Sequence, residues 1–222
     1  MITPTTWMPA AVEALKQAFG PRLRFVGLQG SYRRGEATED SDIDLCVILD
    51  RFTTEDVAAL RAVLDSLPEG EKASGFVAGA AELAAWPRFE LFAFAQDMGA
   101  WYGELAPLLP PLTQADIALG VRTAVAALCH EATQALLLAP RLSPEAAKSA
   151  RHSLRKSFLR ALQGVIYLRD GIFPRDRAEA LRRASEDEAA ILDGAESLPL
   201  PELAAACRDR SAARLRELPF RD

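Results

Sequence analysis

The chain has 222 residues, of which 50% are hydrophobic and 26% charged, and its formal net charge is −5. This composition is typical of a folded protein with one large or two small domains, and it excludes the strongly basic surface of a duplex nucleic-acid binder. No apolar stretch could span a membrane, the first residues lack a signal-peptide pattern, and the three scattered cysteines argue against disulfides and zinc, so a cytoplasmic location is expected.

The first part of the chain alternates helical and strand patterns, which favours an α/β domain. Helical spacing covers residues 7–19, and a Thr-x-x-Asp pattern at Thr53 and Asp56 is typical of a helix start. The expected strands are residues 23–28, 43–49, 74–79 and 88–94, with a helical turn over 80–86.

After residue 97 no strand is expected. A long helical pattern over 113–138 begins with a second Thr-x-x-Asp box, and a helix from Ser143 is expected to reach Asp170 and to end at Gly171. Two or three further helices follow. The sequence therefore predicts an α/β domain at residues 1–97, with a small mixed sheet, and an all-helical domain at residues 98–222.

The most informative stretch is Gly30-Ser31, then ten residues, then Asp42-Ile43-Asp44 at the start of an apolar strand. Side chains alternate along a strand, so Asp42 and Asp44 share one face. Carboxylates and phosphates are the ligands that Mg²⁺ prefers, and a glycine lets the backbone approach a phosphate closely. The alternative is a surface turn that runs into an ordinary strand.

This pattern resembles the signature of the nucleotidyltransferase superfamily, which has the DNA polymerase β-like fold. The superfamily includes aminoglycoside adenylyltransferases, CCA-adding enzymes and the nucleotidyltransferases of toxin–antitoxin pairs. The resemblance covers roughly residues 20–95. Haloacid-dehalogenase-type phosphatases and many glycosyltransferases also use Asp-x-Asp, but there the strand precedes the aspartates, whereas here the strand follows them.

The resemblance implies that Asp42 and Asp44 hold two Mg²⁺ ions. It also implies a third acidic residue on a neighbouring strand, which binds metal or acts as general base. Glu90 is the candidate, because it interrupts the apolar run of the expected strand 88–94. Glu82 and Asp97 are the fallbacks, and the alternative for Glu90 is an exposed carboxylate at a sheet edge.

Several residues are expected to bind the phosphates of ATP. Gly30 and Ser31 form the turn, Arg33 and Arg34 follow it, and Ser41 precedes the first aspartate. In the second domain, basic residues recur at helical spacing. They either contact the phosphates of ATP or form a solvent-exposed face of the helix. They are Lys148, Arg151, His152, Arg155, Lys156 and Arg160.

Arg175 follows a helix that ends in Gly171 and a short loop with a proline. This arrangement is similar to the C-terminal domain of streptomycin/spectinomycin adenylyltransferases, in which a lysine of the corresponding loop contacts the nucleotide. Arg175 keeps the positive charge of that lysine, but its planar guanidinium group replaces the compact ammonium group. Arg160 does not align cleanly with the upstream arginine of that family.

The resemblance implies a metal-dependent adenylyltransferase that moves AMP from ATP to a hydroxyl of a small molecule such as an aminoglycoside, with antibiotic resistance as a possible role. Two alternatives stay open: an antitoxin-like nucleotidyltransferase that binds or adenylylates a protein partner, and a degenerate fold that only binds. Neither duplex nucleic acid nor a membrane is expected as a partner. The sequence leaves the acceptor, the nucleotide preference and the oligomeric state open.

Overall fold

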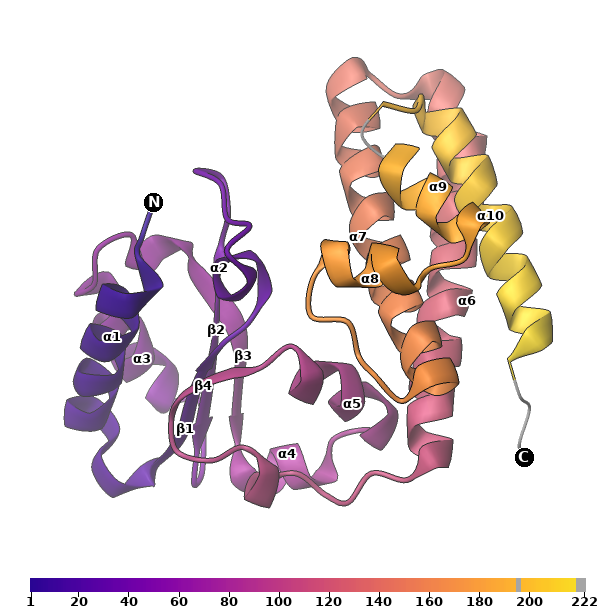
Figure 1. The fold of residues 1–222 in the computed structure, drawn as a ribbon. Helices are drawn as coiled ribbons and strands as arrows, with labels where there is room; N and C mark the ends of the chain where they lie inside the picture. The colour runs from indigo at the N-terminus through magenta and orange to yellow at the C-terminus, as the bar shows by residue number, and fades with distance from the viewer. Residues whose placement is uncertain (195–196, 219–222) are drawn as a thin grey trace. The chain divides into compact units, whose positions relative to one another are not determined.

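The computed structural model describes residues 1–194 and 197–218. It divides the chain into two compact units, Met1–Pro111 and Leu112–Asp222 (Figure 1). The expected boundary after residue 97 falls too early for the first unit, because a strand that begins at Gly99 still belongs to its sheet.

The first unit contains a four-stranded mixed sheet in the order β3-β2-β1-β4. Strand β1 pairs antiparallel with both β2 and β4, whereas β2 and β3 are parallel. The strands are β1 Leu23–Leu28, β2 Ile43–Leu49, β3 Ala73–Gly79 and β4 Gly99–Tyr102. Three of the four expected strands are thus confirmed, and so is the small mixed sheet.

Five α-helices accompany this sheet. They are α1 Pro4–Phe19, α2 Gly30–Arg34, α3 Asp56–Asp65, α4 Ala80–Ala85 and α5 Arg88–Gln96, with 3₁₀ turns at Gly20–Arg22, Gly70–Lys72 and Ala106–Leu108. Figure 1 shows α1 and α3 side by side along the sheet, with α4 and α5 on its other side.

The two faces of β2 follow from the alternation of its side chains. Ile43 and Leu45 are buried in the core that β1 and β2 form with α1 and α3. Cys46 is buried on the opposite face, and its partner in register on β3 is Phe76, whose ring contacts Phe94 of α5. Asp42 and Asp44 alternate with Ile43, so they lie on the face that α5 covers.

The strand expected over residues 88–94 is wrong, because these residues form helix α5. Leu91 and Phe92 are consecutive and both are buried, which suits one side of a helix but would place them on opposite faces of a strand. A short apolar run does not by itself separate the two periods.

The expectation that no strand follows residue 97 is also wrong. Strand β4 is short and lies at the edge of the sheet, where Ala100 and Trp101 are exposed. Its sequence therefore carries no buried apolar alternation that would have revealed it.

The second unit is helical, as expected. Its helices are α6 Gln114–Leu138, α7 Pro144–Asp170, α8 Arg177–Arg183, α9 Glu186–Gly194 and α10 Leu200–Glu217, with a 3₁₀ turn at Ala139–Arg141. The expected capping bonds are present, since Thr113 Oγ1 accepts a hydrogen bond from Asp116 N and Ser143 Oγ accepts one from Ala146 N. Within the described residues, no helix is both long and apolar enough to cross a bilayer.

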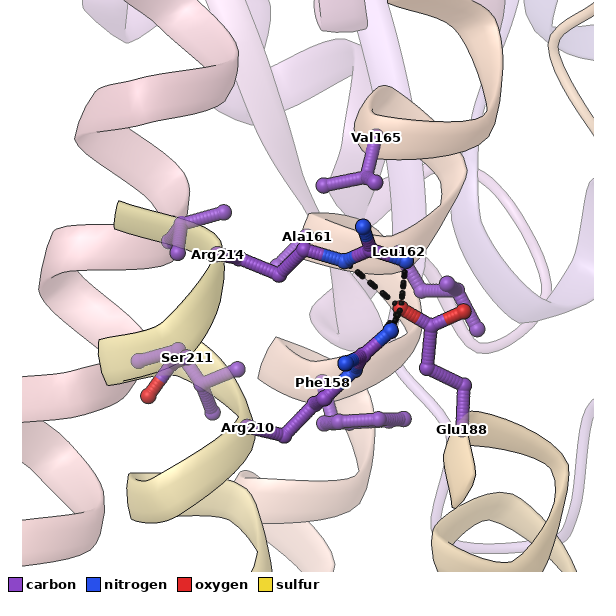
Figure 2. Close-up of a pocket in the computed structure, with 10 residues that line it drawn as sticks. Phe158, Ala161, Leu162, Val165, Glu188, Arg210, Ser211 and Arg214 are labelled. Carbon is purple, nitrogen blue, oxygen red and sulfur yellow. Dashed lines mark hydrogen bonds and ion pairs between the residues drawn. The ribbon is translucent and has the colours of Figure 1, made fainter. Parts of the chain in front are cut away.

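A buried charge cluster joins α9 to α10 in this unit (Figure 2). Glu188 is 1% exposed, and its Oε1 atom accepts hydrogen bonds from Arg210 Nη2 at 2.9 Å and Arg214 Nη2 at 2.6 Å. The three side chains line a cavity of about 20 Å³, room for about one water molecule. The cluster is too small and too fully paired to admit a substrate, so we interpret it as structural.

Candidate active site

The Gly-Ser turn and the aspartate strand meet at one point. The backbone N–H of Gln29 donates to the carbonyl of Asp44 at 2.9 Å, which ties the residue after β1 to the beginning of β2. Gly30 follows with φ +68, and a Cβ atom at this position would overlap Oδ2 of Asp44. Glycine favours this arrangement, because a side chain at residue 30 would strain the backbone and force the Asp44 carboxylate to move.

The two aspartates lie at the beginning of β2, on the sheet face that α5 covers. Asp42 directly precedes the strand and is exposed, and its Oδ2 atom accepts a hydrogen bond from Ser74 Oγ at 3.4 Å. Ser74 is also the residue of β3 that pairs in register with Asp44. Ser74 therefore marks the place where both acidic residues meet the neighbouring strand.

The basic residues after the turn are held by acidic partners. Arg33 and Arg34 lie on α2, and both donate to the carboxylate of Asp97. Arg34 Nε also donates to Glu36 Oε2 at 2.9 Å. Burial lowers the pKa of the Arg34 guanidinium, but the hydrogen bond to Glu36 and the attraction of Asp97 outweigh it, so the pKa lies above its ordinary value.

Asp97 reaches the turn from the C-terminal end of α5. Its Oδ2 atom accepts a hydrogen bond from the Gly30 N–H at 3.2 Å. The side-chain amide of Gln29 donates to the carbonyl of Phe94 at 3.0 Å. This bond holds the C-terminal end of α5 beside Gly30. Sequence reasoning named Asp97 only as a fallback acid and missed Gln29, because the residues before Asp97 were interpreted as a strand.

The residues present fit a divalent cation in part. Two carboxylates at the beginning of β2, one of them packed directly against Gly30, are the oxygen donors that Mg²⁺ prefers. In the part of the chain that the structure describes, however, no group of three histidine, cysteine or acidic residues could hold a metal by itself. The remaining ligands of such an ion would have to be substrate phosphates and water.

The structural premise for Glu90 as the third acid is not met. Glu90 is exposed in the first turn of α5, where its Oε2 atom accepts a hydrogen bond from Trp86 Nε1 at 2.8 Å. It lies two helical turns, about 10 Å along the axis, from Asp97. Glu82, the other fallback, is exposed on α4 and accepts from the N–H of Gly79, so it serves as a helix cap.

The other expected nucleotide-binding residues are spread over both units. Ser31 is half-buried on α2, while Ser41 Oγ accepts a hydrogen bond from the Thr38 N–H within the loop before β2. Arg160 on α7 and Arg175 before α8 are exposed in the second unit. The contacts of the described residues do not test whether these four side chains reach a nucleotide, so that role stays a prediction.

Comparisons with known proteins agree with this arrangement. Residues 9–90 match the model of a family described as a nucleotidyltransferase domain. The chain therefore carries a nucleotidyltransferase domain, and the expected class of enzyme, a nucleotidyltransferase, is confirmed. A search of curated proteins finds no match for the sequence.

A solved structure extends the likeness of the fold to both units. The spectinomycin adenyltransferase AAD(9) from Enterococcus faecialis, solved with ATP and spectinomycin, is 13% identical with a TM-score of 0.56, and the alignment covers 94% of this chain and 99% of that one. A nucleotidyltransferase-like protein from Exiguobacterium sibiricum 255-15 is 13% identical over 95% of this chain and 75% of that one, with a TM-score of 0.37. The first likeness confirms the fold, a mixed-sheet domain followed by a helical one.

Proposed function

We propose that the protein is a metal-dependent adenylyltransferase that transfers AMP from ATP to a hydroxyl of a small molecule such as an aminoglycoside. The observation that carries this proposal is the contact between Gly30 and Asp44. It places a backbone turn suited to phosphates directly against a carboxylate suited to a metal.

The chemistry is a substitution at the α-phosphorus of ATP. The acceptor oxygen forms a bond to this phosphorus, the bond to the bridging oxygen breaks, pyrophosphate leaves, and the hydroxyl proton passes to a base. Asp42 and Asp44 would hold Mg²⁺, which when bound supplies charge neutralisation and lowers the pKa of the acceptor hydroxyl.

The residues of the turn orient the nucleotide. The backbone after Gly30 and the side chain of Ser31 would accommodate the β- and γ-phosphates, and Arg33 and Arg34 would offset their charge. Binding in a fixed geometry and electrostatic stabilisation supply most of the rate enhancement in reactions of this kind. Arg160 and Arg175 are proposed as further phosphate contacts from the helical unit.

The acceptor class rests on a likeness of fold. The structural relative with a TM-score of 0.56 was solved with ATP and spectinomycin. This supports a small, hydroxyl-bearing acceptor as the first class to test, since the same mixed-sheet and helical units are present here.

The experiment is a transfer assay with ATP labelled at the α-phosphate and Mg²⁺. Spectinomycin, streptomycin, other aminoglycosides, tRNA and cell lysate are offered as acceptors. We expect label on a small aminocyclitol or aminoglycoside. Label on a protein of the lysate instead would replace this acceptor by a protein partner. Transfer to none of these, together with no binding of Mg-ATP in calorimetry, would contradict the proposal.

Asp44→Asn is the variant that ties this activity to the site, and Asp50→Asn is its matched control. Both remove one negative charge from β2 or its immediate end, but Asp50 pairs with the exposed Arg24 at the opposite end of the strand. We expect Asp44→Asn to lose binding of Mg-ATP and transfer, while Asp50→Asn keeps both. Equal activity of the two variants would show that the metal is held elsewhere.

A further inference from the structure

The groups proposed to bind the phosphates of ATP donate to a carboxylate in this structure. This carboxylate belongs to Asp97. The Gly30 N–H donates to its Oδ2 atom at 3.2 Å. Arg34 Nη1 donates to both carboxylate oxygens, at 2.9 and 3.2 Å, and Arg33 Nη1 donates to Oδ1 at 3.4 Å. A carboxylate thus accepts the hydrogen bonds from the turn and from both arginines that a phosphate group would accept.

The backbone on both sides of this contact is fixed. Asp97 caps the C-terminal end of α5, with its N–H bonded to the carbonyl of Ala93 at 3.2 Å. The side-chain amide of Gln29 holds the same helix end through Phe94. Only the side chain of Asp97 therefore has to rotate for its carboxylate to leave the turn.

The ion pairs are partly shielded from water. The exposed fraction of the side chain is 31% for Asp97, 24% for Arg33 and 20% for Arg34. Arg34 is held independently by Glu36 through Nε, so its Nη1 atom can change partner while the guanidinium stays in place. Arg34 would thus remain beside Gly30 after Asp97 has moved away.

We propose that Asp97 is an internal competitor of the nucleotide: its carboxylate occupies the phosphate position over Gly30 in the free protein and is displaced when a polyphosphate binds. This inference rests on the proposed function and deepens it. Two anions cannot share the single Gly30 N–H, and a carboxylate left beside the phosphates repels them. The free energy needed to displace Asp97 therefore lowers the apparent affinity for ATP.

The test compares wild type, Asp97→Asn and Asp50→Asn by calorimetry with two probes, inorganic tripolyphosphate without metal and Mg-ATP. Asparagine keeps an acceptor for the Gly30 N–H but removes the charge that competes with phosphate. We expect Asp97→Asn to bind both probes about three- to tenfold more tightly than wild type. Asp50→Asn makes the same change in net charge far from the turn, so its affinities should stay within about twofold of wild type.

Equal or weaker binding by Asp97→Asn, while wild type binds Mg-ATP, would overturn this inference and leave the proposed function standing. Absence of binding by wild type would overturn both. A second measurement does not depend on the variant. In ¹⁵N spectra of wild type, tripolyphosphate should shift the Gly30 amide and the Arg34 Nε–H signals. Binding of tripolyphosphate that leaves these two signals in place would also contradict the exchange.

Discussion

Gly30 lies directly against the carboxylate of Asp44: a Cβ atom at residue 30 would overlap Oδ2 of Asp44, so a side chain there would force this carboxylate to move. The backbone bond from Gln29 N–H to the Asp44 carbonyl holds the two residues together. The position of the Asp44 carboxylate therefore depends on the absence of a side chain at residue 30.

Gly30→Ala should displace Asp44 and lower transfer activity about a hundredfold, since small misplacements of a catalytic group cost this much. Gly35→Ala is the matched control. Gly35 has φ +72, close to that of Gly30, but a Cβ atom there would meet nothing within 4 Å. The control carries the same backbone strain without the collision, so it should keep its activity. Equal losses in both variants would assign the effect to strain alone.

Glu90→Gln tests the remaining part of the sequence-based assignment of the third acid. Because Glu90 is exposed on α5 and bonded to Trp86 Nε1, we expect binding of Mg-ATP and turnover to stay within about twofold of wild type. The measurement is a comparison of kcat and of the dissociation constant of Mg-ATP. A loss of turnover of more than about tenfold with unchanged binding would restore Glu90 as the third acid.

Asp56 should make the stability of the first unit depend on pH. Arg22 donates to both oxygens of its carboxylate, at 2.7 and 3.1 Å, and these bonds hold the pKa of Asp56 at about 2. A pKa below the unfolded value of about 3.9 stabilises the folded state above that pH, and this stabilisation is lost as the pH falls towards 2.

Asp56→Asn should therefore unfold at lower denaturant concentration than wild type at pH 7, and the difference should shrink between about pH 4 and pH 2. Chemical denaturation at a series of pH values measures it. A difference that is constant over this range would mean that Asp56 acts through the hydrogen bonds of its uncharged form at the start of α3, where Thr53 N–H donates to it at 2.9 Å.

Glu188→Gln should destabilise the second unit by about 3 kcal/mol or more, because it leaves Arg210 and Arg214 partly buried without their anion (Figure 2). Burial raises the pKa of Glu188, but the hydrogen bonds from Ser185 N–H and Arg214 outweigh it and lower the pKa below its usual range. Glu186→Gln, an exposed change in the same helix, is the control. Thermal unfolding of the two variants compares them, and equal midpoints would contradict a structural role for the cluster.

The sequence predicted those helices and strands whose buried apolar residues recur at a clear spacing along the chain. Strands β1 and β2 have the predicted bounds because their apolar runs contain valine or isoleucine, which favour strands, and turn residues lie between them. Helix α7 was predictable from its Ser143 cap, its final glycine and its buried face of Leu154, Phe158 and Leu162. Residues 88–94 failed because an apolar run of this length suits both periods, and β4 failed because its short edge strand buries little.

The site was predictable where it is local in sequence and not where it depends on tertiary contact. The sequence pattern identified Gly30, Asp42 and Asp44. These residues lie close together in the chain, in the connection between the antiparallel strands β1 and β2 and at the start of β2. The partnership of Asp97 with Arg33 and Arg34 joins segments about sixty residues apart, which meet where α5 packs against β3. No pattern within a sequence window reports such a contact.

Gln29 has a consequence for how the domain moves. Its backbone N–H donates to the carbonyl of Asp44 and its side chain donates to the carbonyl of Phe94, so one residue joins strand β2 to helix α5, which covers the sheet face of Asp44. We therefore expect opening of α5 and loosening of the Asp44 backbone to be one event in hydrogen exchange, not two. A ligand that slows exchange of the Gln29 amide should slow it throughout the last turn of α5 as well.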